Sequence, residues 1–216
     1  MAIPDTVAEM CRAGVTAVLV YDAQAGILAH VRDREQLVQR IDEVLQAARA
    51  ADVPVFYVKH VSLPPSHLGV GGLRTAMAWQ RVTKAAEVTT AFPPGAAHTQ
   101  IVSELAPRDG EPVFEKLGMS ALVGTPLEAA LRDRGVTTLA LVGAVLEIGI
   151  EPTARHAADL GFLPVVVEDA CGIVDPEAAE RSLTSLDYSL LSYRCSSRDL
   201  VDAFGAVGLP PGAASA

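Results

Sequence analysis

Residues 141–161 have the sequence LVGAVLEIGIEPTARHAADLG, which predicts a buried strand, a tight turn and then a helix. The helix begins near Pro152, because proline is tolerated in the first turn of a helix and not in its interior. An enzyme can hold a nucleophile at a turn of this kind. This turn contains neither serine nor cysteine, and Gly149 stands where such a side chain would be expected.

The backbone of the turn can still do chemistry. Amide groups at the start of a helix have no partner within the helix, so we expect those of residues 149–151 to face a cleft. Together with the turn 145–149 they would form an anion or oxyanion site. The alternative is that Gly149 only supplies the geometry of the turn.

The same alternation of strand and helix extends over the rest of the chain. Further apolar runs predict strands at 16–22, 54–60, 112–116 and 163–170, besides the strand at 137–144 that leads into the turn. Helical patterns are predicted over 34–53, 73–88, 125–136, 151–161, 176–191 and 196–204, and Thr125 is the expected N-cap of the third of these. Strands that are apolar on both faces are typical of a parallel sheet covered on both sides. We therefore predict an α/β fold, a Rossmann-like three-layer sandwich with a mostly parallel central sheet flanked by helices.

Length and composition limit the range of functions. The chain has 216 residues, half of them apolar, and a formal charge of −9. These values favour one domain over residues 1–208 with a disordered tail at 209–216, and they argue against nucleic acid or a membrane as partner. The three cysteines, Cys11, Cys171 and Cys195, match no zinc or disulfide pattern, and no signal peptide is evident. A cytoplasmic location follows as the simplest expectation.

In a parallel sheet, functional groups collect at the carboxyl ends of the strands. Asp22 ends the first predicted strand, Lys116 ends the third, and Gly149 follows the fourth. A lysine beside a partly buried aspartate would keep it ionised or share a proton with it. The competing interpretation is a capping aspartate and an ordinary surface lysine paired with Glu115.

Other candidate residues lie between these strands. Arg74 and Trp79 fall in a predicted lid segment and would shape a pocket for a planar or carboxylate-bearing ligand, although both also fit ordinary core or surface roles. His60 and His67 flank a loop without a third ligand, so we expect no metal and no other cofactor. Cys171 follows the last predicted strand, either as a reactive thiol or, more commonly, as a small buried hydrophobe.

Three stretches, taken together, resemble the isochorismatase-like (cysteine hydrolase) superfamily over residues 14–200. AVLVYDAQ (17–24) resembles its first strand, which ends in an acidic residue followed by glutamine, here Asp22 and Gln24. FEKLGMSALVGTPLEAALRDRGV (114–136) resembles the segment with its lysine, here Lys116. The stretch LALVGAVLEIGIEPTARHAADLGFLPVVVEDACG (139–172) resembles the strand, turn and helix that carry its cysteine.

The resemblance implies a site in which one group is missing. In amidase members an Asp–Lys–Cys triad attacks an amide or imide carbon, and the position of the cysteine is Gly149 here. Isochorismatases proper resemble this chain in having glycine there, and they cleave a vinyl ether without a covalent intermediate. The resemblance also implies a cis peptide between Ala144 and Val145, which would aim backbone amides at the substrate. It implies further substrate contacts from Gln24, His60 and Ile148.

The substrate loop departs from both branches of the family. YVKHVSLPPSH (57–67) lacks the glutamine of isochorismatases and the Asp-x-His of metal-binding nicotinamidases. We therefore predict a hydrolase that works without a cysteine nucleophile, with Asp22 and Lys116 as its acid–base pair. Its substrate would be a small carbonyl- or carboxylate-bearing molecule, with cyclic compounds and enol ethers among the candidates. The alternative is a non-catalytic relative that binds a small molecule or serves in assembly, and the resemblance suggests a homodimer or homotetramer in either case.

Overall fold

The computed structural model describes residues 4–207, and the predicted tail 209–216 lies outside them. Its centre is a six-stranded sheet in the order β3-β2-β1-β4-β5-β6, and every neighbouring pair of strands is parallel. The strands are β1 (Thr16–Tyr21), β2 (Val55–His60), β3 (Val113–Lys116), β4 (Thr138–Ala144), β5 (Leu163–Gly172) and β6 (Tyr193–Cys195). The predicted three-layer α/β fold is therefore confirmed.

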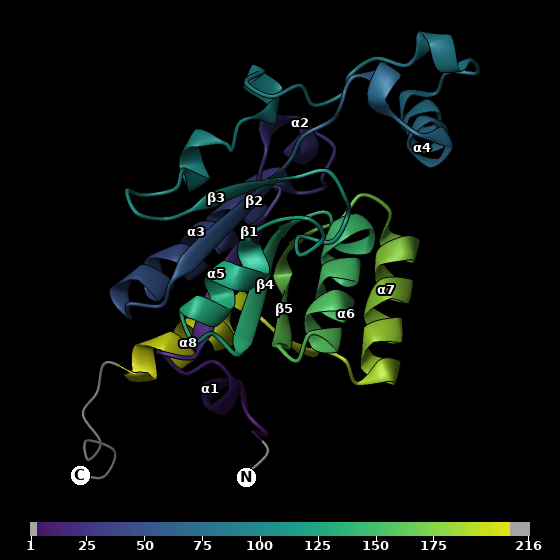
Figure 1. Ribbon diagram of the computed structural model, residues 1–216. Helices are drawn as coiled ribbons and strands as arrows, with labels where there is room; N and C mark the ends of the chain where they lie inside the picture. Colours follow the sequence, from purple (N-terminus) through teal and green to yellow (C-terminus); the bar gives the residue numbers. More distant parts are fainter. Residues whose placement is uncertain (1–3, 208–216) are drawn as a thin grey trace, which may run out of the picture.

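Helices cover both faces of the sheet (Figure 1). One face carries α1 (Val7–Met10), α3 (Arg34–Ala50) and α8 (Ser197–Val207), and the other carries α5 (Leu127–Asp133), α6 (Glu151–Asp159) and α7 (Pro176–Ser189). Alternate residues of β1 serve the two layers: Val18 and Val20 pack on the side of α3, while Leu19 and Tyr21 pack on the side of α6. Every residue of β1 and β4 is buried, which explains why their sequences are apolar on both faces.

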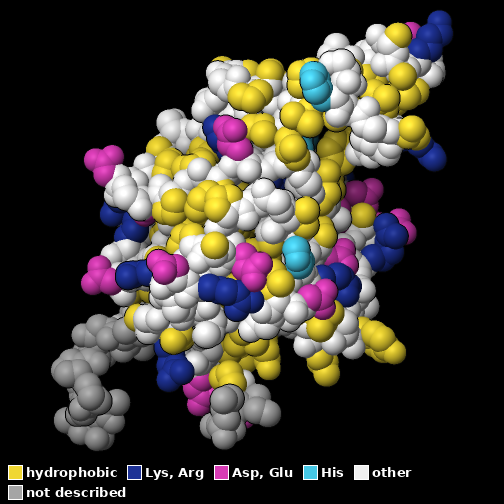
Figure 2. All heavy atoms as spheres, viewed as in Figure 1, with side chains coloured by type: hydrophobic (Ala, Val, Ile, Leu, Met, Phe, Trp, Pro, Cys, Tyr) yellow, Lys and Arg dark blue, Asp and Glu magenta, His cyan; other side chains and the backbone are white. Residues whose placement is uncertain are grey.

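The segment between β2 and β3 extends away from this body. It contains helix α4 (Val70–Gln80) and the turns η1 (Pro65–His67), η2 (Ala85–Glu87), η3 (Ala97–Thr99) and η4 (Ser103–Leu105). An isolated antiparallel bridge between Gln24 and Ile101 joins the end of this segment to the start of the short helix α2 (Ala25–Leu28). Helix α4 projects from the body at the upper right of Figure 1. None of the residues of α4 is buried, and Figure 2 shows hydrophobic side chains exposed over this part of the surface.

Several boundaries differ from the sequence prediction. The helix predicted over 73–88 begins at Val70 and ends at Gln80, where Arg81 takes a left-handed conformation, and only the turn η2 follows. Helix α5 is capped by Pro126 rather than by Thr125, whose Oγ1 accepts a 3.4 Å hydrogen bond from the Leu127 amide. Strand β6 was not predicted.

Candidate active site

The strand order brings the predicted site residues to one place. The order reverses between β1 and β4, and in open α/β sheets ligands bind at the carboxyl ends of strands where such a reversal occurs. Asp22 follows β1, Lys116 ends β3, and the turn with Gly149 follows β4. Three segments that are far apart in the sequence are therefore placed at the carboxyl-terminal end of the sheet.

Asp22 and Lys116 form a buried ion pair. The Lys116 Nζ donates to Asp22 Oδ2 at 2.7 Å, and Lys116 and Asp22 are 2% and 4% exposed. Asp22 has a φ of 46°, a left-handed conformation that aspartate tolerates better than most residues. A second hydrogen bond of 3.2 Å joins Nζ to the Gly118 carbonyl, so the ammonium is held from two sides.

Burial and charge act on this pair in opposite directions. Burial raises the pKa of Asp22 to about 6, although the charge and the hydrogen bond of Lys116 lower it. Burial also lowers the pKa of Lys116, and Asp22 opposes this shift. Among the described residues, Asp22 Oδ1 has no hydrogen-bond partner. One carboxylate oxygen is thus held by lysine while the other remains able to accept a proton.

The turn after β4 has the expected cis peptide but not the expected free amides. The peptide bond between Ala144 and Val145 is cis, and a π-helical turn, η5 (Leu146–Ile150), follows it. Within that turn the amides of Gly149 and Ile150 donate to the Val145 carbonyl at 2.9 and 3.2 Å, and the amide of Glu151 donates to the Leu146 carbonyl. The predicted anion or oxyanion site from the amides of 149–151 is therefore wrong, because the π-turn uses these amides internally.

Gln24 also has a different role from the predicted substrate contact. It is fully buried, and its Nε2 donates to the carbonyls of His60 and Thr99 at 2.9 and 2.8 Å. Its Oε1 accepts from the His60 amide at 2.6 Å. Both donors of the side-chain amide are occupied and the residue is fully buried, so Gln24 fixes the end of β2 and has no donor left for a ligand.

His60 stays beside the ion pair. Burial lowers its pKa to about 4, and the charge of Lys116 acts in the same direction, so the ring is neutral at pH 7. The ring meets Phe92 edge-on at 5.5 Å, and its Nε2 lies 3.3 Å from Ser62 Oγ. A neutral imidazole next to the Asp22–Lys116 pair fits the predicted contact with a substrate, which stays a prediction.

Arg74 and Trp79 are not brought to the pair. Both lie on the projecting helix α4, where Arg74 is exposed and Trp79 is 54% exposed. Within residues 4–207, no hydrogen bond or ion pair links them to Asp22 or Lys116. Ile148, predicted from the turn, is 37% exposed, whereas Ala144 and Val145 are buried.

Cys171, the remaining candidate nucleophile, is part of the hydrophobic core. Cys171 is buried, its Sγ donates to the Leu141 carbonyl, and burial raises its pKa well above the usual range. It is therefore a poor nucleophile. In the described part of the chain, no group of three His, Cys, Asp or Glu side chains could hold a metal ion. None of the described helices has the length and apolar character needed to cross a membrane.

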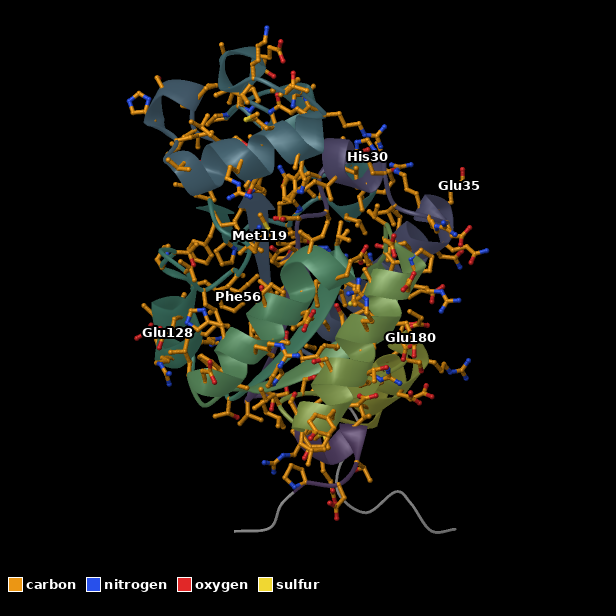
Figure 3. All side chains as sticks on the ribbon, turned by 90° about the vertical axis from the view of Figure 1, so that its right-hand side faces the viewer. His30, Glu35, Phe56, Met119, Glu128 and Glu180 are labelled. Carbon is orange, nitrogen blue, oxygen red and sulfur yellow. The ribbon has the colours of Figure 1, made fainter. Side chains whose placement is uncertain are left out.

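Sequence reasoning missed Tyr21, the last residue of β1. It is 1% exposed, and its ring centre lies 4.3 Å from Lys116 Nζ. Its hydroxyl donates to the carbonyl of Met119, a residue of the loop that follows Lys116. Figure 3 labels Met119 on the side of the body that faces α4. The signal in the sequence was a polar ring tip in an otherwise aliphatic strand, next to the candidate aspartate.

Comparison with known proteins identifies the class to which this fold and site belong. The model of the isochorismatase domain matches residues 16–195. The chain therefore belongs to the isochorismatase family of hydrolases.

Particular relatives agree with this assignment. The chain is 32% identical over 178 residues to the uncharacterized isochorismatase family protein YecD of Escherichia coli O157:H7, covering 81% of this chain and 88% of that protein. It is 25% identical over 213 residues to the ureidoacrylate amidohydrolase RutB of Pseudomonas syringae pv. syringae, covering 91% and 86%. A cysteine hydrolase from Pseudomonas syringae pv. phaseolicola has the same fold, with a TM-score of 0.77, 23% identity, and coverage of 92% and 96%.

Proposed function

We propose that this protein hydrolyses a small carbonyl- or carboxylate-bearing molecule by acid–base chemistry, without a cysteine nucleophile. The observation that carries the proposal is the buried Asp22–Lys116 pair with its unpartnered Oδ1. Burying two charged groups is costly even when they pair. A buried pair at the end of the sheet where ligands bind is therefore a candidate for a catalytic role. The relatives that act on amides, such as the ureidoacrylate amidohydrolase, support the substrate class.

The pair can run a hydrolysis in which protons balance. At neutral pH Asp22, with its pKa of about 6, is mainly a carboxylate. Its Oδ1 takes a proton from water as the water oxygen bonds to the carbonyl carbon. The bond from that carbon to the leaving group then breaks as the same proton passes from Asp22 to the leaving group. Lys116 keeps Oδ2 in place throughout. In its protonated form Asp22 would instead donate its proton to the vinyl carbon of an enol ether; water would add to the resulting oxocarbenium carbon, and the hemiketal would break its ether C–O bond to give a ketone and an alcohol, with the water proton returning to Asp22.

Further parts of the proposal concern the molecule as a whole. Residues 1–208 would act as one hydrolase domain in the cytoplasm, with no nucleic acid or membrane as partner. Self-association as a homodimer or homotetramer fits the exposed apolar side chains of α4, such as Val70 at 77% and Trp79 at 54%.

A turnover screen tests the proposal. The protein is incubated with isochorismate and a panel of small cyclic and linear amides, imides and enol ethers, and products are followed by NMR. We expect turnover that falls by at least ~10²-fold in Asp22→Asn, since a general acid or base contributes this much. Asp52→Asn is the matched control, because Asp52 is also left-handed, with φ 53°, but is exposed. Equal activity in Asp22→Asn and the wild type would refute the proposal.

A cavity away from the pair favours a second candidate, a protein that binds a small molecule without converting it. A cavity of about 710 Å³ lies between α3, β5 and α7 and is lined by Arg32, Arg40, Glu168 and Glu180 among others, but not by Asp22 or Lys116. NMR shifts that a panel compound induces equally in the wild type and in Asp22→Asn, without turnover of any compound, would support this candidate.

A further inference from the structure

Gly149 is required by the side chain of Tyr21. An ideal Cβ added to Gly149 would lie 2.1 Å from the Tyr21 hydroxyl oxygen, 2.4 Å from Cζ and 2.5 Å from Cε1. Non-bonded carbon atoms prefer separations of about 3.5–4.0 Å, so no side chain fits at residue 149 while the ring stays where it is. The Tyr21 ring therefore occupies the space that a side chain at residue 149 would need, so each of the two residues requires the other.

Moving the Tyr21 ring out of this position would be energetically unfavourable. Tyr21 is 1% exposed in the layer between the sheet and helices α5 to α7. Its hydroxyl donates to the Met119 carbonyl, and its face supports the Lys116 ammonium at 4.3 Å. A displaced ring would leave the buried Tyr21 hydroxyl and the partly buried Met119 carbonyl without their hydrogen bond and would remove a cation–π contact, and both losses are unfavourable.

We propose that Tyr21 is a positioning residue that fills the volume of a nucleophilic side chain, and that the site is closed to covalent catalysis by this ring as well as by the lack of a thiol. The proposal shares its site with the proposed function but does not depend on Asp22 performing hydrolysis. It implies that a thiol placed at 149 becomes reactive only when the ring is removed.

Tyr21 does not replace the nucleophile chemically. Burial, with the nearby charge of Asp22, raises its pKa well above the usual value of a phenol, so it keeps its proton at neutral pH. The proton is directed to the Met119 carbonyl. The ring acts through the space it occupies, which makes the proposal testable with a residue that keeps the ring but lacks the hydroxyl.

Thiol labelling of designed variants tests the proposal without any substrate. Gly149→Cys is compared with Tyr21→Val/Gly149→Cys and Tyr21→Phe/Gly149→Cys in native buffer with iodoacetamide, whose iodide is displaced by a thiolate. Peptide mass mapping reports labelling at residue 149. We expect the double variant with valine in place of the ring to react at least tenfold faster than the other two, because an aromatic ring persists in those two. The ammonium of Lys116, which lies over the face of the ring that is removed, should favour the thiolate form of the new thiol.

The native thiols and a second substitution serve as controls. Cys11, Cys171 and Cys195 are buried and should stay unlabelled in all variants, including the single variant Tyr21→Val. If a cysteine variant does not fold, the comparison uses Gly149→Ala, which we expect to lower the urea midpoint more in the wild type than in Tyr21→Val. Equal labelling with and without the ring, or equal effects of Gly149→Ala in both backgrounds, would overturn the proposal. Loss of turnover in Asp22→Asn bears on the proposed function alone.

Discussion

Replacing Lys116 with methionine should destabilise the protein in a way that depends on pH. Methionine keeps most of the length and volume of lysine but removes the ammonium that lies 2.7 Å from Asp22 Oδ2. The carboxylate then remains in a site that is 4% exposed without its counter-ion. Removing one partner of a buried ion pair costs roughly 3–5 kcal/mol.

The magnitude follows from the pKa of Asp22. The folded state raises it from 3.8 to about 6. Because the folded protein binds this proton more tightly than the unfolded chain, the stability falls as pH rises from about 4 to about 6, by roughly 3 kcal/mol at 1.36 kcal/mol per pKa unit. Without Lys116 the pKa of Asp22 rises further, so the fall continues above pH 6. The cost of Lys116→Met should be about 3–5 kcal/mol at pH 8 and below about 1 kcal/mol at pH 4.5, where Asp22 is protonated.

Urea unfolding of variant and wild type at the two pH values measures these costs. Lys59→Met is the matched control, because Lys59 of β2 pairs with Glu115 of β3 at 3.2 Å in a partly exposed position. Glu115 is the residue just before Lys116. An exposed pair of this kind contributes about 0–1 kcal/mol, with little change between the two pH values. A cost of Lys116→Met that is equal at pH 4.5 and pH 8 would refute the account of the buried pair.

Other predictions concern single side chains. Gln24→Met should lower the free energy of unfolding by about 2–4 kcal/mol, as urea unfolding would measure, because it leaves backbone groups of His60 and Thr99 without their hydrogen bonds. A loss below about 0.5 kcal/mol, roughly the size of an ordinary surface effect, would contradict this role. Cys171 should resist iodoacetamide in the folded protein at pH 8, as peptide mapping would show, and rapid labelling would restore it as a candidate nucleophile. Trp79→Ala should change the melting temperature by less than about 2 °C, since the side chain is half exposed, while a raised KM would show that α4 contacts the substrate.

The strands and layers were predictable because their cause is local. The runs at 16–22, 54–60 and 137–144 are mostly apolar on both faces, and this pattern is typical of a parallel sheet that helices cover on both sides. Strand β6 escaped prediction because Tyr193 and Arg194 are exposed at the sheet edge and give no apolar run. The bounds of α4 were predicted wrongly because none of its residues is buried. Its hydrophobic pattern therefore does not reflect packing against a core.

The site was predictable only in part, because its details depend on contacts between distant segments. Asp22 and Lys116 follow from the rule that strand ends collect functional groups. The amides of the turn were misplaced because a π-helical turn is not encoded by any pattern we recognised. Gln24 and Tyr21 could not be assigned from sequence, since their partners, His60 and Gly149, lie 36 and 128 residues away in the chain.

The pH dependence of kcat/KM tests the central claim most directly, on whichever panel compound is turned over. If Asp22 acts as a general base, kcat/KM should rise with pH through a midpoint of about 6 and level off above it. If it acts as an acid on an enol ether, the profile should fall through the same midpoint. In both cases Asp22→Asn should remove the inflection and at least ~10²-fold of the rate. A profile without an inflection near pH 6, or one that Asp22→Asn leaves unchanged, would contradict the account.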